Sequence, residues 1–255
     1  MVHPSAVVHS KAQVGSNCEI GPCCVIGEHV VLGDDCRLHS HVVIDGHTTL
    51  GRGNEIFPFV SLGLKTQDMK WSGGVTRTEI GEHNTFREHV TVHSATGGGD
   101  ATIVGSNNHL LAYCHVAHDC RLGNHIVMSN VATLAGHVVV EDYAVIGGLA
   151  AVHQFCRIGK MAIIGGCSKV VQDVPPFMLA DGNPAETRTI NKVGLDRNSV
   201  SEEVQGVLKQ AYKILFRERL TISNALAKIE SELPPSPELQ HLVQFVRKTE
   251  RGISK

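Results

Sequence analysis

The segment Cys114-His115-Val116-Ala117-His118-Asp119-Cys120 places two histidines and an aspartate between two cysteines. An imidazole titrates near neutral pH, so His118 can act as a general base that deprotonates a hydroxyl or an amine. The adjacent carboxylate of Asp119 can orient the ring and stabilise its cation. The repeat described next directs both thiols inward, and no serine is placed as a nucleophile. The residues therefore favour direct attack by a bound acceptor, as in acyl transfer.

The elements that position these residues follow a period of six. From Val2 to Val170, 26 of the 29 positions reached in steps of six are large and apolar, and the exceptions are Asp68, Gly74 and Gly98. Glycine often comes next, which suits a sharp turn with unusual backbone angles. A small residue, often cysteine, stands four positions after the large one. Neither a helix nor a single strand has this period, which is typical of a hexapeptide-repeat parallel β-helix.

The repeat stops near Pro175-Pro176, and helical signals begin at about residue 188. We expect a mainly β chain, with the β-helix over residues 1–187 and a C-terminal α-helical domain over residues 188–255. Loops are expected near 64–79 and 94–102, and helices near 199–217, 221–232 and 236–250. The first helix would begin with a capping box from Ser199 to Glu202. The helices would cover the unpaired strand edges at the end of the solenoid.

The charge balance argues against a nucleic-acid or membrane ligand for the chain as a whole, since the formal net charge is −2. Residues 1–187 hold 11 Lys/Arg and 17 Asp/Glu, whereas residues 188–255 hold 12 and 8, so the basic tail suits an acidic partner. The chain start lacks the features of a signal peptide, and no apolar run is long enough to cross a bilayer. We expect a cytoplasmic protein whose eight cysteines are free thiols, six of them at the small inward position.

Three hexads form one triangular coil, so residues 18 apart stack on each other. Gly136 then lies beside His118, and its N–H is open to a tetrahedral oxyanion. His137 lies about 5 Å from Asp119, one strand spacing away. His153 and Gln154 follow one coil later.

The two gaps in the repeat decide what else reaches His118. If both loops leave the β-helix, Val92 and Val116 stack, which brings His93 close to His118. The first loop then carries Asp68 and Lys70 to the same place. Gly147-Gly148 would stack on Gly165-Gly166 and leave a strip without side chains beside this cluster, suited to a long, flat ligand.

Several motifs resemble those of the UDP-N-acetylglucosamine O-acyltransferases of lipid A biosynthesis. They are Ser40-His41-Val42-Val43, His115-Val116-Ala117-His118-Asp119-Cys120, Ala132-Thr133-Leu134-Ala135-Gly136-His137, Ala151-Val152-His153-Gln154-Phe155, Gly165-Gly166-Cys167-Ser168 and Gln172-Asp173-Val174-Pro175-Pro176. The resemblance covers nearly the whole chain. It implies a left-handed coil and a homotrimer with active sites between subunits. It also implies a 3-hydroxyacyl donor on acyl carrier protein, which is acidic in that family, and the 3-hydroxyl of UDP-N-acetylglucosamine as acceptor. No metal and no cofactor beyond the carrier's phosphopantetheine are expected.

The resemblance also implies residue roles. His118 is the general base, Asp119 its partner and Gly136 the donor of the oxyanion amide. Substrate contacts are expected from Asp68, Lys70, His93, His115, His137, His153 and Gln154. Asn191 and Arg197 match nucleotide contacts, and Gly166 matches the position that limits acyl length. The chain departs from the family at Val193, where a glutamate is common, and at Asn198, where a second basic residue is.

Three alternatives remain open from the residues alone. A hexapeptide-repeat carbonic anhydrase would bind zinc through histidines of neighbouring subunits. A related N-acyltransferase would act on a 3-amino UDP-sugar, because His118 can serve either nucleophile. A solenoid without enzymatic activity would have no function for the residues that stack around His118. The acyl chain length is also open.

Overall fold

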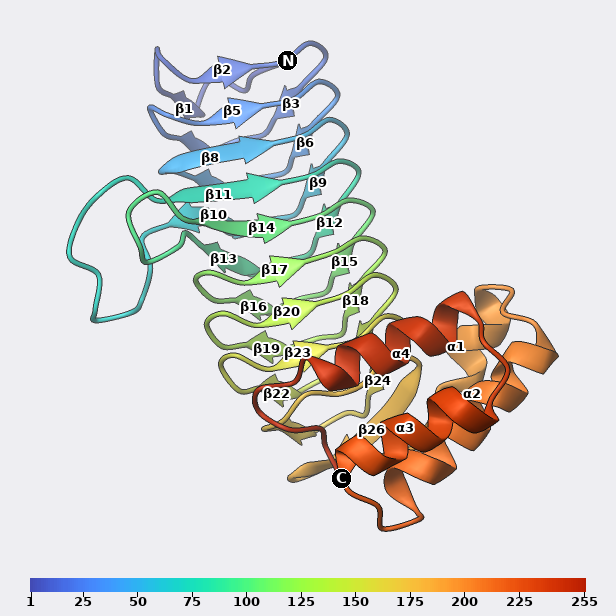
Figure 1. Ribbon diagram of the computed structural model, residues 1–255. Coiled ribbons are helices and arrows are strands. Elements are labelled where there is room, and N and C mark those ends of the chain that lie inside the picture. Colours follow the sequence, from blue (N-terminus) through green and yellow to red (C-terminus); the bar gives the residue numbers. More distant parts are fainter.

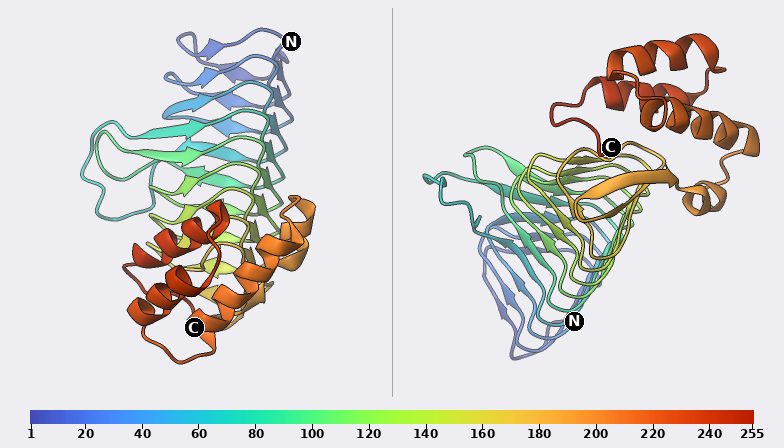
Figure 2. Two further views of the ribbon diagram at one scale, coloured as in Figure 1. Left: turned by 45° about the vertical axis from the view of Figure 1, so that its right-hand side comes forward. Right: turned by 90° about the horizontal axis from the view of Figure 1, so that it is seen from below.

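Most hexads form a strand of two residues followed by a turn, and the strands wind into a left-handed coil with a triangular cross-section (Figures 1 and 2). The computed structural model describes all residues 1–255. Left-handed crossovers between parallel strands are an exception to the usual rule. The mainly β fold with C-terminal helices agrees with the prediction from the repeat.

The coil builds three sheets, one on each face of the triangle. The first contains β1 (Val7–Val8), β4 (Val25–Ile26), β7 (Val43–Ile44), β10 (Ser61–Leu64), β13 (Thr91–His93), β16 (His115–Val116), β19 (Thr133–Leu134), β22 (Ala151–Val152) and β25 (Lys169–Val170). The second contains β2 (Gln13–Val14), β5 (Val31–Leu32), β8 (His47–Leu50), β11 (Arg77–Ile80), β14 (Ala101–Val104), β17 (Arg121–Leu122), β20 (Val139–Val140) and β23 (Arg157–Ile158).

The third sheet contains β3 (Glu19–Ile20), β6 (Arg37–Leu38), β9 (Glu55–Ile56), β12 (Thr85–Phe86), β15 (His109–Leu110), β18 (Val127–Met128), β21 (Val145–Ile146), β24 (Ile163–Ile164), β26 (Met178–Gly182) and β27 (Ala185–Ile190). All pairings are parallel except the hairpin of β26 and β27. The first corner of the triangle joins the first sheet to the second, as at residues 117–120. The second corner joins the second sheet to the third, and the third corner leads back to the first sheet.

The stacking register matches the arithmetic of the repeat. Val116 pairs with Leu134, and Leu134 pairs with Val152, each 18 residues further on. The chain leaves the coil as two loops, residues 65–76 between β10 and β11 and residues 94–100 between β13 and β14 (Figure 1). Val92 pairs with Val116, 24 residues further on, because the second of these loops lies between them. The condition for bringing His93 near His118 is therefore met.

The interior of the coil is apolar, and the cysteines belong to it. The large position of each hexad points inward, and residues such as Ile44, Leu110 and Leu134 are fully buried. Six of the eight cysteines are buried at the small inward position, namely Cys18, Cys24, Cys36, Cys114, Cys120 and Cys156, and all eight are free thiols. The prediction for the cysteines is confirmed.

The glycine after many large positions serves close packing and not, as the sequence suggested, an unusual φ. A Cβ added at Gly21 would lie 2.6 Å from the carbonyl oxygen of His39 in the next coil. The left-handed residue comes two positions later and, except at Gly53, is not glycine, as at Cys23 (φ 57°) and Asp119 (φ 61°). Asp, Asn and His tolerate this conformation better than most residues, which accounts for their frequency in these turns.

The C-terminal part holds four helices: α1 (Lys192–Arg197), α2 (Glu202–Phe216), α3 (Ile222–Glu232) and α4 (Pro237–Arg247). The last three lie where helices were expected, whereas the short α1 was missed. The N-cap of α2 is Ser201, whose side chain accepts from the N–H of Val204, so the predicted capping box at Ser199 is wrong. Ser199 instead has a φ of 57°. None of the helices is long and apolar enough to span a membrane.

The helices lie beside the last coils and not across the end of the solenoid (Figure 2). They form a second apolar core with Met161, Phe177 and Met178. The end itself is covered by the hairpin and by the C-terminal segment, where Asp173 exchanges backbone hydrogen bonds with Gly252 and Ser254. The expectation that the helices cover the end is therefore wrong. Strand β27 runs across residue 187, where the boundary between the two domains was expected.

Candidate active site

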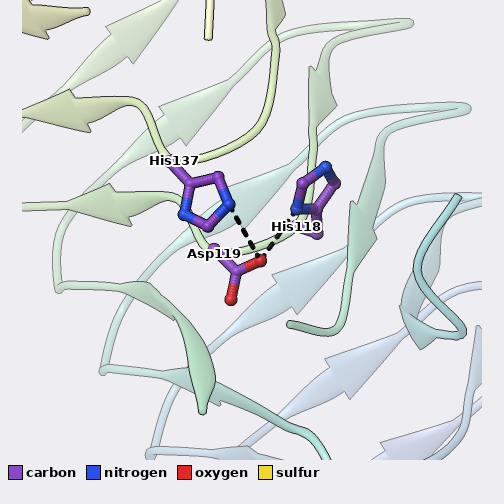
Figure 3. A group of neighbouring side chains, drawn as sticks. All are labelled: His118, Asp119 and His137. Carbon is purple, nitrogen blue, oxygen red and sulfur yellow. Dashed lines mark hydrogen bonds and ion pairs between the residues drawn. The ribbon is translucent and has the colours of Figure 1, made fainter. Parts of the chain in front are cut away.

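The first corner brings His118 and Asp119, in the turn after β16, together with Gly136 and His137, in the turn after β19 (Figure 3). The Nδ1 atom of His118 lies 2.8 Å from Oδ2 of Asp119. The Nε2 atom of His137 lies 3.6 Å from the same oxygen. Because an ionised carboxylate only accepts hydrogen bonds, this contact favours, in the neutral ring, the tautomer with its proton on Nδ1 and a lone pair on Nε2.

Asp119 has two further hydrogen-bond partners in addition to His118 and His137. Its carboxylate accepts from the backbone N–H of Thr96 in the second loop, at 3.2 Å to Oδ2. Its own N–H donates to Oγ1 of Thr102 at 2.8 Å. Only 9% of the Asp119 side chain is exposed, so these bonds compensate for the lost water and fix the carboxylate.

The first loop reaches the other side of the imidazole. Oδ2 of Asp68 lies 4.0 Å from Nε2 of His118. Lys70 contributes a backbone N–H, which donates to Oδ1 of Asp68 at 2.9 Å, whereas its side chain is exposed. The sequence therefore correctly predicted that this loop approaches His118.

Gly136 lies directly against the ring of His118. A Cβ added there would lie 2.3 Å from Cε1 and 2.5 Å from Nε2 of His118. The N–H of Gly136 donates no hydrogen bond within the chain. A backbone donor next to Nε2 is thus available to a ligand that binds at this nitrogen.

A buried histidine, His93, and a partly buried one, His115, form a pair beside this group. Their rings pack edge to face with centroids 5.1 Å apart. Burial lowers the pKa of His115 to about 4, with smaller effects from His93 and His118. Burial also lowers the pKa of His93, whose Nδ1 is buried without a hydrogen-bond partner. Nδ1 of His115 bonds Oγ1 of Thr91 at 2.7 Å. Both histidines are therefore neutral at neutral pH.

The remaining predicted residues do not join this group within one chain. His153 and Gln154 are exposed at the first corner one coil further on, where Nδ1 of His153 lies 3.1 Å from the Gln154 carbonyl oxygen. Asn191 is buried near the second corner as the N-cap of α1, where it donates to the Met161 carbonyl oxygen and accepts from Gly194. Arg197, in the last turn of α1, is exposed.

The glycine pairs stack as predicted but at another corner. A Cβ at Gly147 would lie 2.6 Å from the N atom of Gly166, and one at Gly166 would have only the carbonyl oxygen of Gly148 nearby, at 3.3 Å. These turns follow β21 and β24, so they form the third corner. The expectation that this strip lies beside the His118 cluster is wrong for a single chain, because the first sheet separates the two corners.

One group of side chains at the site could hold a metal ion. The ligand atoms of His118, Asp119 and His137 all lie within 4.8 Å of one another. The neighbouring thiols do not extend this group, since burial raises the pKa of Cys114 to about 11 and that of Cys120 to about 12. Thiols with such values stay protonated and are poor metal ligands.

The threonines around the site were missed by the sequence reasoning. Thr91, Thr96 and Thr102 hold His115 and Asp119, and Thr66 bonds Thr96 between the two loops at 2.8 Å. Only Thr91 could have been placed from the repeat. When the loop residues are left out of the numbering, Thr91 falls directly below His115 in the stack. Thr66 and Thr96 lie in the loops, where no period applies.

Known proteins that cover most of this chain at 35–48% identity carry the name of one family. Residues 173–254 match the family described as Udp N-acetylglucosamine O-acyltransferase; Domain 2. An acyl-[acyl-carrier-protein]–UDP-N-acetylglucosamine O-acyltransferase of Thermodesulfovibrio yellowstonii is 48% identical over 220 residues, which are 86% of this chain and 85% of the relative.

Solved structures agree over the full length. The UDP-N-acetylglucosamine acyltransferase LpxA of Bacteroides fragilis 9343 superposes with a TM-score of 0.97 at 38% identity and covers 100% of both chains. LpxA of Acinetobacter baumannii superposes with a TM-score of 0.96 at 40% identity, over 100% of this chain and 99% of the other. By fold, by length and by sequence, the chain belongs to the family of UDP-N-acetylglucosamine O-acyltransferases.

Proposed function

We propose that this enzyme transfers a 3-hydroxyacyl chain from acyl carrier protein to the 3-hydroxyl of UDP-N-acetylglucosamine, the first step of lipid A biosynthesis. The name of the Thermodesulfovibrio relative includes both substrates. The observation that carries the proposal is the imidazole of His118, bonded to Asp119 through Nδ1 and open at Nε2 beside Gly136. The cytoplasmic location expected from the sequence stays part of the proposal.

His118 acts as the general base in this proposal. Its Nε2 takes the proton of the sugar hydroxyl while the oxygen attacks the carbonyl carbon of the thioester. A C–O bond forms and the carbonyl π electrons move to oxygen, which gives a tetrahedral oxyanion. Asp119 stabilises the imidazolium that results. Collapse of the oxyanion breaks the C–S bond, and the imidazolium returns its proton to the leaving thiolate, so the products are an ester and the carrier thiol.

The N–H of Gly136 is the donor for the oxyanion. It is a fixed backbone group without a partner in the chain, so it needs no rearrangement when the charge develops. Asp68, Lys70, His93, His115, His137, His153 and Gln154 are proposed as substrate contacts around this centre. The orphaned Nδ1 of His93 supports this role, because a buried polar atom without a partner gains from a ligand that supplies one.

A homotrimer with active sites between subunits completes the proposal. Within one chain, Gly166 lies at the third corner and Asn191 near the second, whereas His118 lies at the first. These residues can act on one substrate pair only if corners of different copies meet. Acyl carrier protein, an acidic partner, would dock on the basic tail, where Lys209, Lys213 and Arg217 are exposed along α2 and its C-cap.

Substitution His118→Ala tests the function directly. Loss of a general base costs about 100- to 10,000-fold, so transfer from acyl carrier protein to UDP-N-acetylglucosamine should fall by at least about 100-fold. Circular dichroism and sedimentation should show an unchanged fold and oligomer. Substantial residual turnover would sink the role of general base, and absence of transfer by the native enzyme would sink the proposed substrates.

Product analysis separates the remaining alternatives. Mass spectrometry with a panel of acyl donors and with 3-hydroxyl and 3-amino acceptors should give the ester of UDP-N-acetylglucosamine as the favoured product. Because His118, Asp119 and His137 could hold a metal ion, metal analysis of the active enzyme is the matching control. Stoichiometric zinc together with hydration of carbon dioxide would instead support the carbonic anhydrase alternative.

A further inference from the structure

Two loops leave the solenoid near the first corner, and hydrogen bonds join them into one unit (Figure 1). At their base, the N–H of Ser94 donates to the carbonyl oxygen of Leu64 at 2.9 Å. At the return of the first loop, Oγ1 of Thr76 donates to Oγ of Ser94 at 3.2 Å. Between these points the hydroxyls of Thr66 and Thr96 lie 2.8 Å apart.

Thr66 holds the part of the first loop that faces His118. Its side-chain oxygen accepts from the N–H of Asp68 at 3.0 Å, in addition to its bond with Thr96. A hydroxyl has one donor and two acceptor sites, so it can make both bonds at once. Thr66 is only 6% exposed, in contrast to the exposed neighbours Lys65 and Gln67. Because the neighbouring loop residues are exposed, the buried hydroxyl of Thr66 indicates that this side chain has a structural role.

Thr96 makes the corresponding connection on the other side of the imidazole. Its backbone N–H donates to Oδ2 of Asp119 at 3.2 Å, and that oxygen bonds Nδ1 of His118 at 2.8 Å. Asp68, held by Thr66, lies 4.0 Å from Nε2 of the same ring. The bond between the two threonines therefore ties together the carboxylates that flank His118.

We propose that the Thr66–Thr96 hydroxyl pair is a positioning clasp that sets Asp68 against the reactive nitrogen of His118. The inference rests on the proposed function, in which the acceptor binds at Nε2. Without the clasp, Asp68 is carried by a loop that Thr66 no longer ties to the second loop. Displacement of a positioning group by about 1 Å can cost 100-fold in rate, although no atom of the clasp touches the reacting groups.

Thr66→Val is the decisive variant, because valine keeps the shape and removes the hydroxyl. We expect kcat/KM for UDP-N-acetylglucosamine to fall about 10- to 100-fold, while KM for acyl carrier protein stays within about twofold. Thr66→Ser keeps the hydroxyl and should stay within about threefold of the native enzyme. Thr96→Val cuts the same bond from the other side and should reproduce the loss.

Double variants test whether the Thr66–Thr96 pair acts through Asp68. If the clasp acts through Asp68, Thr66→Val should have little further effect in an Asp68→Ala background, and Thr66→Val with Thr96→Val should be no worse than either alone. Thr78→Val is the matched control, since the hydroxyl of Thr78 is buried without a partner. It should leave kcat/KM unchanged.

Three outcomes would overturn the clasp: full activity of Thr66→Val, equal damage by Thr66→Ser, or additive losses with Asp68→Ala. Thermal unfolding of each variant separates loss of positioning from loss of fold, and Thr96→Val, which cuts the same bond, answers the question even if Thr66→Val unfolds. Failure of the proposed function is distinguishable, because the native enzyme itself would then transfer no acyl group to this acceptor.

Discussion

The imidazole of His118 lies between two carboxylates that are held in different ways. Asp119 is hydrogen-bonded at 2.8 Å and is 9% exposed, so it fixes the ring and its tautomer. Asp68 lies at 4.0 Å from the other nitrogen and is 22% exposed on a loop, which leaves room for a ligand group between them. One carboxylate therefore orients the proposed base, and the other faces the space where the acceptor would bind in the proposed reaction.

Gly136→Ala should remove activity without removing the fold. The added methyl would lie 2.3 Å from Cε1 of His118, and the end of a side chain can move where a backbone cannot. The ring must then turn away from the Gly136 N–H, so the proposed base and the proposed oxyanion donor no longer point at the same substrate atoms. We expect kcat/KM to fall about 100-fold or more. Steady-state kinetics, with thermal unfolding as the measure of stability, check this.

Gly206→Ala provides the comparison for this variant. A Cβ at Gly206, on α2, meets no atom within 4 Å, so transfer should be unchanged. If Gly136→Ala were as active as Gly206→Ala, the contact between Gly136 and His118 would have no part in the reaction.

His115 makes the stability of the fold sensitive to acid. Burial lowers its pKa from 6.5 to about 4. Between these values the unfolded chain binds more protons at this residue than the folded chain does, so the free energy of unfolding should fall as the pH falls from 6.5 to 4. His115→Gln should flatten this part of the profile in chemical denaturation.

An exposed histidine supplies the control for the pH profile. His109 lies in β15 with its side chain in solvent, so His109→Gln should keep the full acid dependence of the native enzyme. A His115→Gln protein that lost as much stability on acidification as the native chain would show that His115 is not the group responsible.

At the scale of elements, the turns after β16 and β19 could be derived from the sequence because their register is set by backbone hydrogen bonds. Each coil adds 18 residues, as Val116↔Leu134 shows, so the neighbours of His118 follow from counting. Loop residues such as Asp68 could be placed only near the site. Their position depends on side-chain bonds like Thr66–Thr96, which have no period. The same holds for the caps, where Ser201 and not Ser199 begins α2.

A ladder of buried asparagines supports the coils from which the loops depart. Asn54, Asn84 and Asn108 are buried one above another at the second corner. The side-chain oxygen of Asn84 accepts from the backbone N–H of Asn108 at 2.9 Å, and that of Asn54 accepts from the N–H of Asn84 at 2.9 Å. Each asparagine therefore satisfies an amide that an apolar residue would leave unpaired.

Asn84→Leu should destabilise the fold by about 1–3 kcal/mol, the cost of leaving the buried N–H of Asn108 without a partner. Denaturant unfolding monitored by circular dichroism measures this. Leucine keeps the branched four-atom skeleton of the asparagine side chain, but its methyl groups are larger, so a packing cost adds to the loss of the hydrogen bond.

Ile126→Leu tests leucine at the same corner, because Ile126 continues the column and is fully buried. A swap of equal volume should cost less than about 1.5 kcal/mol. Equal stability of the two variants would mean that the asparagine ladder does not hold these coils.

At the scale of the whole molecule, the residues that the family resemblance assigns to one site are distributed over three corners. His118 and its neighbours occupy the first corner, Asn191 caps α1 near the second, and Gly166 lies at the third. No rearrangement of a rigid solenoid brings the corners of one chain together. The repeat predicts which residues stack on each other at a corner, whereas the surface that joins copies has no period and could be inferred only from the resemblance.

Mixed trimers test this arrangement. His118→Ala removes the proposed base, and Gly166→Met should fill the proposed groove for a long acyl chain, because only the Gly148 carbonyl oxygen lies near the added carbon. Each variant alone should be inactive with a long-chain donor. If a site combines His118 of one copy with Gly166 of the next, equal amounts of the two chains in mixed trimers should restore about a quarter of the sites.

A mixture of His118→Ala and His137→Ala chains is the control for this experiment. Both residues contact Asp119 of the same chain, at 2.8 and 3.6 Å, so no mixed trimer contains a corner with both histidines intact, and no activity should return. Recovery with Gly166→Met but not with His137→Ala places the acyl groove and the base on different copies. If Gly166→Met and His137→Ala restored activity equally, or if neither restored it, a site shared between subunits would be contradicted. His118 and Gly166, which lie at different corners of one chain, would then not meet in the active trimer.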